Sequence, residues 1–232
     1  MNRELIESGE ISVEGRLVDA SNATLFVTIS NGAGEMKAIY KPIAGERPLW
    51  DFADGSLAHR EYAAYLVSDY LDFNCVPLTI LRDGPYGFGM VQEWITIDDS
   101  IDLGSFFSTD HPHLRSMALF DAIINNTDRK IGHLLPVDEH RVLGCDHGVT
   151  FHCEDKLRTV LWQWADESFN EAELMTLQKA EKAFQGELAE RLEPYLTQEE
   201  ISTTLNRVQT LLSRKRFPLP NPNWPAVPWP AF

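Results

Sequence analysis

The chain has 232 residues, of which 44% are hydrophobic, and its formal net charge is −15. This length suffices for one large domain or two small lobes. The negative charge excludes broad binding to nucleic acid, which depends on Lys and Arg contacts to phosphates, and disfavours docking on anionic lipid.

Targeting signals are not evident in the sequence. No run of about 18 apolar residues predicts a membrane span, so we expect no stable membrane insertion. The first residues, "MNRELIESGEISVEG", lack the apolar centre of a signal peptide. The three cysteines have no framework spacing, which is typical of a reducing compartment. We therefore expect a cytoplasmic protein.

The first 95 residues predict five strands and one helix. The first two strands are expected from apolar runs, the second of them β-branched, and the third from an alternating run. An Asn-Gly turn signal separates the second run from the third, so the three strands predict an antiparallel meander. A helical pattern follows, with Ala58, Tyr62, Tyr65 and Leu66 on one side, and then two more strands. The expected strands are 11–19, 23–29, 36–42, 76–84 and 87–95, and the expected helix is 57–71.

The remainder is predicted to be mainly helical. The run 114–124 reads as a buried helix, and "HLLPV" with "RVLGCD" reads as a short hairpin. Ser168 with Glu171, and Thr197 with Glu200, have capping-box spacing at the starts of two further helices. The last 16 residues hold six of the 13 prolines together with two Trp and two Phe. They cannot form a helix, and their aromatic content favours a strap packed on the helices.

These elements predict a two-lobed α+β fold. A small antiparallel sheet with one helix forms an N-lobe over residues 1–94, and helices form a C-lobe over residues 95–216. Residues 217–232 are expected to be a Pro/Trp-rich C-terminal strap.

Four charged residues occur in an order that suits phosphoryl transfer. Lys41 ends a strand, Glu61 lies within the following helix, Asp128 follows a buried helix, and Asp146 precedes His147-Gly148. Phosphoryl transfer needs a cation on the phosphates, a metal held by carboxylates and an aligned acceptor. Taken singly, each signal is weak, because a lone Lys at a strand end is usually solvated and an Asp before Gly is usually a turn residue. Together they predict a site in which Glu61 holds Lys41, Asp146 holds Mg²⁺ and Asp128 activates a hydroxyl.

Several motifs resemble the phosphatidylinositol 3-/4-kinase-like branch of the protein-kinase-like superfamily. "YKPIAGERP" followed by "REYAAYLVSDYLDFNCVPLT" resembles type II phosphatidylinositol 4-kinases. "NNTDRKIGHLL" resembles their catalytic loop, and "GCDHGVTF" their Asp-x-Gly metal motif. "YKP…GERPLWDF", "DRK…GHLL" and "DHG" are also similar to motifs of actinobacterial phosphatidylinositol-kinase-like proteins. The resemblance covers roughly residues 14 to 155.

The resemblance implies a role for each matching residue. Lys41 matches the ATP-binding lysine, Glu61 its helix partner, Asp128 the catalytic aspartate and Asp146 the metal-binding aspartate. "MVQEW" matches the hinge, where backbone groups near Gln92 and Glu93 would meet adenine. "DASNAT" occupies the place of a phosphate-covering loop, in which Ser21, Asn22 and backbone amides would cradle phosphate. Arg129, beside Asp128, is expected to pair with Asp128 or with a phosphate.

Two departures from the family pattern concern the metal and the acceptor. His133 stands five positions after Asp128, where these kinases carry Asn as a metal ligand, and magnesium prefers oxygen to imidazole. The segment after Asp146 holds only Lys156 and Arg158 besides histidines, where inositol-lipid kinases carry a basic cluster. We therefore expect Mg²⁺ or Mn²⁺ with ATP, and a hydroxyl on a protein or small molecule in preference to phosphoinositide.

Three alternatives remain open from the sequence. A pseudokinase that binds nucleotide without turnover is favoured by His133. An adenylyl transferase on the same fold would use the same residues. A binding module unrelated to kinases would place Lys41 and Asp146 far apart.

Overall fold

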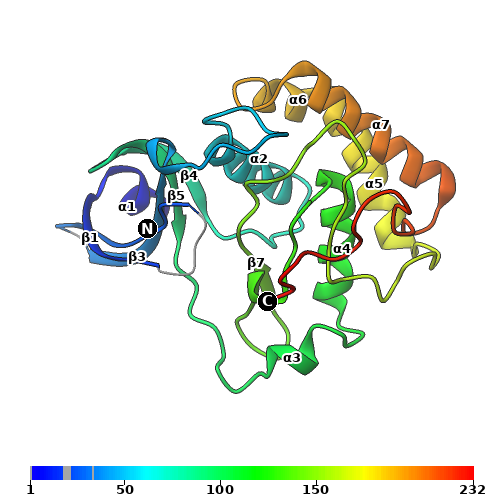
Figure 1. The fold of residues 1–232 in the computed structure, drawn as a ribbon, viewed down its shortest axis with the longest axis horizontal. Coiled ribbons are helices and arrows are strands. Elements are labelled where there is room, and N and C mark those ends of the chain that lie inside the picture. Colours follow the sequence, from blue (N-terminus) through cyan, green and yellow to red (C-terminus); the bar gives the residue numbers. More distant parts are fainter. Residues whose placement is uncertain (1, 18–21, 33) are drawn as a thin grey trace.

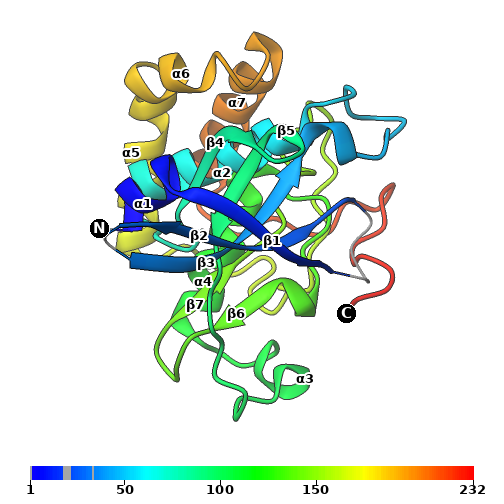
Figure 2. The same cartoon turned by 90° about the vertical axis from the view of Figure 1, so that its left-hand side faces the viewer.

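The computed structural model describes residues 2–17, 22–32 and 34–232. Within them the chain forms a sheet lobe and a helical lobe (Figures 1 and 2). The elements, in chain order, are α1 Asn2–Ser8, β1 Glu10–Arg16, β2 Leu25–Asn31, β3 Gly34–Pro42, the 3₁₀ turn η1 Ile43–Gly45, α2 Leu57–Tyr70, β4 Thr79–Gly84, β5 Gly87–Glu93, α3 Leu103–Phe106, α4 Pro112–Ile124, the 3₁₀ turn η2 Ile131–His133, β6 Leu134–Pro136, β7 Val142–Gly144, α5 Glu171–Phe184, α6 Glu187–Leu192 and α7 Gln198–Arg214.

The first lobe is a five-stranded antiparallel sheet with the order β1-β2-β3-β5-β4. The predicted meander and the β4–β5 hairpin are confirmed. Strand β3 lies in the middle of the sheet, and Lys41 near its end is paired in register with Met90 of β5. At the neighbouring pair, a Cβ on Gly89 would lie 2.4 Å from the Lys41 carbonyl oxygen, so only glycine permits this approach. The sheet thus fixes the backbone from which the Lys41 side chain extends.

Helix α1 was not predicted from the sequence, because only two of its seven residues, Leu5 and Ile6, are apolar and the others are polar or charged. Its Leu5 and Ile6 are buried with Val27, Ile29 and other apolar residues of the sheet in a small core. This packing supplies the stabilisation that an isolated helix of this length lacks in water.

Helix α2 is confirmed, but its predicted single apolar face is wrong. Buried residues occur on all sides of the helix, among them Arg60 and Glu61, because α2 lies between the sheet and the helical lobe. Ala63, Ala64 and Val67 belong to the large core of the helical lobe.

The second lobe is built on the buried helix α4, which packs with α5 and α7. The hairpin β6–β7 is confirmed. The Thr197–Glu200 capping box is confirmed at α7. The one predicted at Ser168 and Glu171 is wrong, because the capping residue of α5 is Asn170, with Glu173 as its partner. The same Glu173 also binds Arg115 of α4.

Residues 217–232 lie against the helical lobe as an irregular segment with turns and bends and no helix or strand. Phe217 is buried and stacks edge-on against Phe169, with ring centroids 4.8 Å apart. Further along, the Ala226 carbonyl accepts hydrogen bonds from the Thr159 amide and the Trp162 indole, and the Ala231 carbonyl accepts one from the Ile131 amide.

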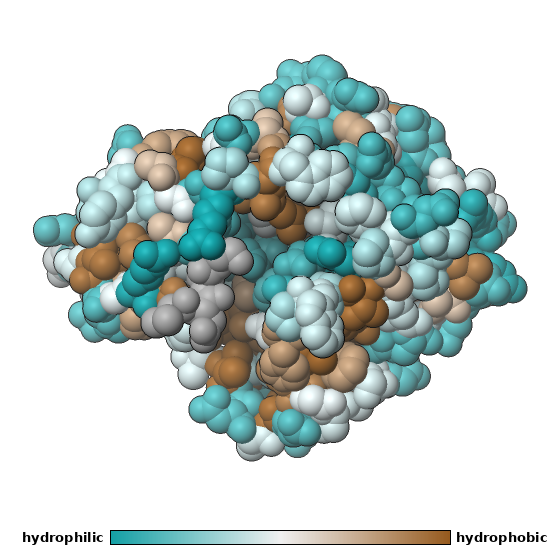
Figure 3. Space-filling view, viewed as in Figure 1, coloured by the Kyte–Doolittle hydropathy of each residue, from teal (hydrophilic) through white to brown (hydrophobic). Residues whose placement is uncertain are grey.

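The two lobes leave a hollow between them on the face shown in Figure 3. Among the described residues, no helix has both the length and the apolar content needed to cross a membrane.

Candidate active site between the lobes

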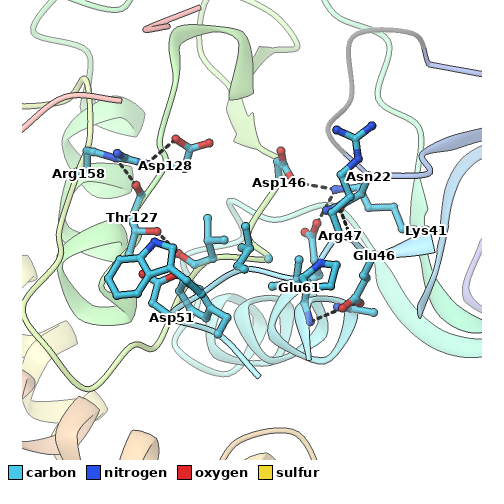
Figure 4. A pocket seen from close by; sticks show the side chains of 18 of the residues that line it. Asn22, Lys41, Glu46, Arg47, Asp51, Glu61, Thr127, Asp128, Asp146 and Arg158 are labelled. Carbon is cyan, nitrogen blue, oxygen red and sulfur yellow. Dashed lines mark hydrogen bonds and ion pairs between the residues drawn. The ribbon is translucent and has the colours of Figure 1, made fainter. Parts of the chain in front are cut away.

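Lys41, Glu61 and Asp146 come together between the lobes. Lys41 Nζ lies 2.6 Å from Glu61 Oε1 and 2.8 Å from Asp146 Oδ1 (Figure 4). The three residues come from strand β3, helix α2 and the segment after β7, and Asp146 is 105 residues from Lys41 in the chain. The expectation of a binding module with Lys41 far from Asp146 is therefore excluded.

The local charges favour the ionised forms of Lys41 and Asp146. Burial by itself would lower the pKa of Lys41, but the Asp146 and Glu61 carboxylates outweigh it and raise that pKa. Lys41 in turn holds the pKa of Asp146 far below its usual range. Burial raises the pKa of Glu61, and Lys41 opposes that shift. The Asp146 side chain remains 49% exposed, so its outer edge is open to a ligand.

Glu61 lies in the N-terminal part of helix α2, whose first turn is fixed by contacts to other elements. The Glu46 carboxylate accepts the Leu57 and Ala58 amides at the start of the helix, where acceptors are favoured. Arg60 is buried, pairs with Glu200 of α7 and donates to the Thr150 carbonyl. Glu61 therefore has little freedom to turn away from Lys41, and its second oxygen accepts the His147 amide at 2.9 Å.

Asp146 has a backbone φ of 59°, in the left-handed region. Aspartate tolerates this region better than most residues, but the conformation is uncommon and concentrates at functional sites. It turns the chain sharply after β7, so that the carboxylate meets Lys41 while His147 is fully buried. The Nδ1 atom of His147 has no hydrogen-bond partner among the described residues.

The two asparagines before Asp128 shape the loop that carries it. Asn125 ends α4 with a φ of 52° and donates to the His152 and Glu154 carbonyls. Asn126 accepts the Asp128 amide at 3.0 Å and donates to the buried Asp121. Neither asparagine was predicted to have a role, although an Asn-Asn pair directly after an apolar helix is a signal of such a loop.

The Asp128 side chain lies on the opposite side of the pocket from Lys41 and Glu61, with Asp146 between them (Figure 4). Its Oδ1 accepts from Arg158 at 3.2 Å, and Lys130 is 3.5 Å from its other oxygen. Arg158 also donates to the Thr127 carbonyl at 2.6 Å. Arg158 thus fixes the loop at Asp128 and at the residue before it. From the sequence, Arg158 was expected only to be one of few basic residues after Asp146.

The prediction that Arg129 pairs with Asp128 or with a phosphate is wrong. The Arg129 side chain is 0% exposed and forms a bidentate pair with Asp121 of α4, at 3.0 Å and 2.9 Å. It also donates to the Cys145 carbonyl, directly before Asp146. Its guanidinium points into the lobe, where the Asp121 carboxylate is also fully buried. Arg129 therefore links the Asp128 loop to the Asp146 segment from inside the helical lobe.

His133 lies beside Asp146, with 3.4 Å between Nε2 and Oδ2. Burial lowers the pKa of His133, so the imidazole is neutral. Its Nδ1 accepts a long hydrogen bond, 3.5 Å, from the Lys130 amide, which leaves the ring proton on Nε2, facing Asp146. In this tautomer Nε2 donates, and it would have to lose its proton before it could bind a metal.

Two cavities meet at Lys41 and Asp146, which line both. The hinge-side cavity, about 460 Å³, lies under the end of the sheet and is lined by Leu17, Ile39, Gln92, Glu93, Trp94, Leu135 and Cys145, among others. The Asp128-side cavity, about 450 Å³, is lined by Asn22, Arg47, Trp50, Thr127, Asp128, Arg158 and Trp224, among others. Either volume is within the range of small-ligand sites.

The remaining predicted residues fall on the two sides of this arrangement. Gln92 and Glu93 line the hinge-side cavity, but the Gln92 side chain donates to Thr79 and the Glu93 amide to the Leu78 carbonyl. Asn22 lines the other cavity and accepts the Arg47 amide. Ser21 lies outside the described residues.

The chemistry of the donors suits a magnesium–nucleotide complex better than a metal alone. Within the described ranges, no group of three or more His, Cys, Asp or Glu side chains converges to hold a metal. Magnesium is commonly bound by one or two carboxylates, with phosphate oxygens and water as the other ligands. The half-exposed, ionised Asp146 beside a positively charged Lys41 fits that pattern.

No protein-family profile matches the sequence. The structure is similar to the crystal structure of a Helicobacter pylori proinflammatory kinase, CtkA, with a TM-score of 0.50 and 11% identity, over 90% of this chain and 93% of that one. This likeness shows the two-lobed kinase-like fold, as predicted.

In sequence, the chain is 40% identical to Protein Rv2133c of Mycobacterium tuberculosis. The alignment of 263 residues covers 98% of this chain and 94% of that protein. The chain therefore belongs to the same family as Rv2133c and has a kinase-like fold.

Proposed function

We propose that this protein is an ATP-dependent phosphotransferase, related to the phosphatidylinositol 3-/4-kinase-like enzymes, that phosphorylates a hydroxyl group. One observation carries the proposal: Lys41 Nζ lies between Glu61 and Asp146 where two ligand-sized cavities meet, and Asp128 lines one of them. The kinase-like fold supports a phosphotransferase in general, whereas the roles of individual residues rest on the geometry of the site and on the family resemblance.

The hinge-side cavity is the proposed site of the nucleotide base. Its apolar walls, Leu17, Ile39 and Leu135, suit a planar ring. The amides of Glu93 and Trp94 already donate to the carbonyls of Leu78 and Lys37. Adenine recognition would therefore rely on other backbone groups, such as those of residues 95–97, which line the same cavity. The proposed lobe boundary near residue 94 agrees with this position of the hinge.

Lys41 would bind the phosphates and would be oriented by Glu61. Asp146 would hold the magnesium or manganese ion. His133 would be a second contact once its ring proton moves from Nε2 to Nδ1, which gives up the hydrogen bond from the Lys130 amide. The bound metal would neutralise charge that develops on the phosphates during transfer. Asp128 would accept the proton of the acceptor hydroxyl, which enters from the Asp128-side cavity. Arg129 would act only through the two segments that it joins.

The direct test incubates purified protein with ATP labelled at either the α- or the γ-phosphate, with Mg²⁺ or Mn²⁺, and follows both the label and ATP consumption. Transfer or hydrolytic release of the γ-label is expected. Transfer of the α-label would instead identify an adenylyl transferase. The absence of an ATP-dependent thermal shift and of turnover with either metal would refute the proposal.

A nucleotide-binding protein without phosphoryl transfer is the second candidate, and His133 favours it. A neutral imidazole that presents its N–H to Asp146 replaces an oxygen ligand in the metal site. The distinguishing result is an ATP-dependent thermal shift with no γ-phosphate release in the presence of either metal.

A further inference from the structure

We propose that the C-terminal segment 217–232 is part of the acceptor side of the site, and that Trp224 is a positioning residue for Asp128. This inference rests on the proposed function only in calling the Asp128-side cavity the acceptor site. Its structural content, that Trp224 fixes the Asp128 loop, stands independently of it.

Arg158 is the link between Trp224 and Asp128. The Arg158 guanidinium lies 6.0 Å from the centre of the Trp224 ring, and the same guanidinium contacts Asp128 Oδ1 and the Thr127 carbonyl. A guanidinium on an indole face gains cation–π attraction and loses rotational freedom. Trp224 therefore restricts the side chain that holds the Asp128 carboxylate.

Lys156 anchors the same indole from a second direction. Its ammonium lies 5.2 Å from the Trp224 ring and 4.6 Å from the ring of Trp50, which belongs to the loop between β3 and α2. It also pairs with Asp51 at 2.9 Å, and its side chain is only 3% exposed. One buried cation thus holds the tail, the loop before α2 and the helical lobe together at the wall of the Asp128-side cavity, which both tryptophans line.

Backbone hydrogen bonds continue the connection from the tail to the Asp128 loop. The Thr159 amide donates to Ala226 of the tail, and the Arg129 amide donates to the Arg158 carbonyl. The Ile131 amide, two residues before His133, donates to the Ala231 carbonyl. The loop is therefore supported by the tail on both sides of Arg129.

The Trp224 ring is held by its faces and not by its indole nitrogen. The indole Nε1 is buried without a hydrogen-bond partner among the described residues. A phenylalanine would keep a π-face for Arg158 and Lys156 without that unsatisfied donor. The nearby Trp229 is 92% exposed, and no ring or cation contact involves it within the described chain, so it provides a matched control in the same tail.

The test compares hydrogen–deuterium exchange of the full chain with that of Trp224→Ala, Trp224→Phe and Trp229→Ala. In Trp224→Ala we expect about five- to thirtyfold faster exchange at the Arg129 and Thr159 amides. This factor corresponds to the local stability that is lost when the cation–π contacts are removed. Trp224→Phe and Trp229→Ala should exchange as the unmodified protein does. Should Trp224→Ala not fold, Trp224→Leu keeps an apolar side chain without a strong cation contact and is expected to show the same increase.

Turnover of ATP supplies the second measurement. Trp224→Ala is expected to lower kcat by about tenfold or more through misplacement of Asp128, with an unchanged KM for ATP, because the hinge-side cavity is not lined by Trp224. Equal exchange in Trp224→Ala and Trp229→Ala would overturn the inference, as would a uniform increase over the whole chain. If the unmodified protein had no turnover, the proposed function would fail while the exchange result would still decide the role of Trp224.

Discussion

Lys41 and Asp146 lie on different lobes and are joined by an ion pair of 2.8 Å, with Glu61 on the other side of the same ammonium. The Lys41 ammonium therefore forms ion pairs with two carboxylates at once. A shared cation beside a half-exposed carboxylate is a site ready to exchange one partner for an anionic ligand.

Replacing Lys41 by Met should abolish the stabilisation of the protein by ATP, because the phosphates lose their cation and Asp146 keeps an uncompensated charge. The measurement is the shift of Tm with ATP and Mn²⁺. Lys37→Met is the matched control, since Lys37 is on the same strand but is 43% exposed and pairs with Glu14. An equal ATP-dependent shift in both variants would contradict the role of Lys41.

Replacing Asp128 by Asn should remove turnover and leave ATP binding intact. The amide cannot accept the acceptor proton, and general-base catalysis is typically worth about 10²–10⁴-fold. Release of γ-phosphate and the ATP-dependent Tm shift should be measured on the same sample. Asp138→Asn, in the exposed turn after β6, is the control and should behave as the unmodified protein. Unchanged turnover in Asp128→Asn would exclude Asp128 as the base.

The sequence predicted the sheet, the main helices and the four residues at the cleft, because these depend on local patterns. Alternating apolar residues and an Asn-Gly turn specify the β2–β3 hairpin, and a Lys at a strand end followed by a Glu in the next helix has a recognisable spacing. Such signals lie within a few residues of the feature that they predict.

The features that the sequence did not reveal depend on how separate elements pack against one another, and not on a local pattern. The Arg129–Asp121 pair looks like two unrelated charges until α4 and its following loop fold back on each other. Trp224 and Arg158 are 66 residues apart in the numbering of the chain, and nothing in a proline-rich tail indicates which arginine it will cover. The two-sided burial of α2 was missed for the same reason, since its second face packs on a lobe that follows it in sequence.

The buried pair of Arg129 and Asp121 should matter for stability far more than an exposed one. Arg129→Ala leaves the Asp121 carboxylate buried without its main partner, a change that typically costs about 3–5 kcal/mol. Urea unfolding measures the difference. Arg191→Ala breaks a pair in which both side chains are more than half exposed, and should cost at most about 1 kcal/mol. Similar losses in the two variants would show that the Arg129 pair is not a structural anchor.

Cys75 should make the protein less stable at high pH. Burial raises the pKa of the Cys75 thiol from 9.0 to about 12, so the native thiol stays protonated while the unfolded one ionises. The unfolded state then binds fewer protons, and the free energy of unfolding falls as the pH rises above about 9 towards 12, by up to about 1.4 kcal/mol per pH unit. Urea unfolding at pH 8 and pH 10.5 should show a steeper loss for the unmodified protein than for Cys75→Ala. A parallel loss in the two proteins would contradict this assignment.

His133 should decide which metal the protein uses. Asn in its place would present a carbonyl oxygen to the metal, where the neutral imidazole presents an N–H towards Asp146. Because magnesium prefers oxygen ligands and manganese accepts nitrogen more readily, His133→Asn is expected to raise the ATP-dependent Tm shift and turnover with Mg²⁺ relative to Mn²⁺.

The measurement is the ratio of each quantity with the two metals, so a general change in stability cancels. His140→Asn, in the exposed β6–β7 turn, is the matched control and should leave both ratios unchanged. Identical ratios in His133→Asn and in the unmodified protein would place His133 outside the metal's contacts. Its imidazole would then serve to orient Asp146, and the oxygen ligands of the metal would come from Asp146, the phosphates and water.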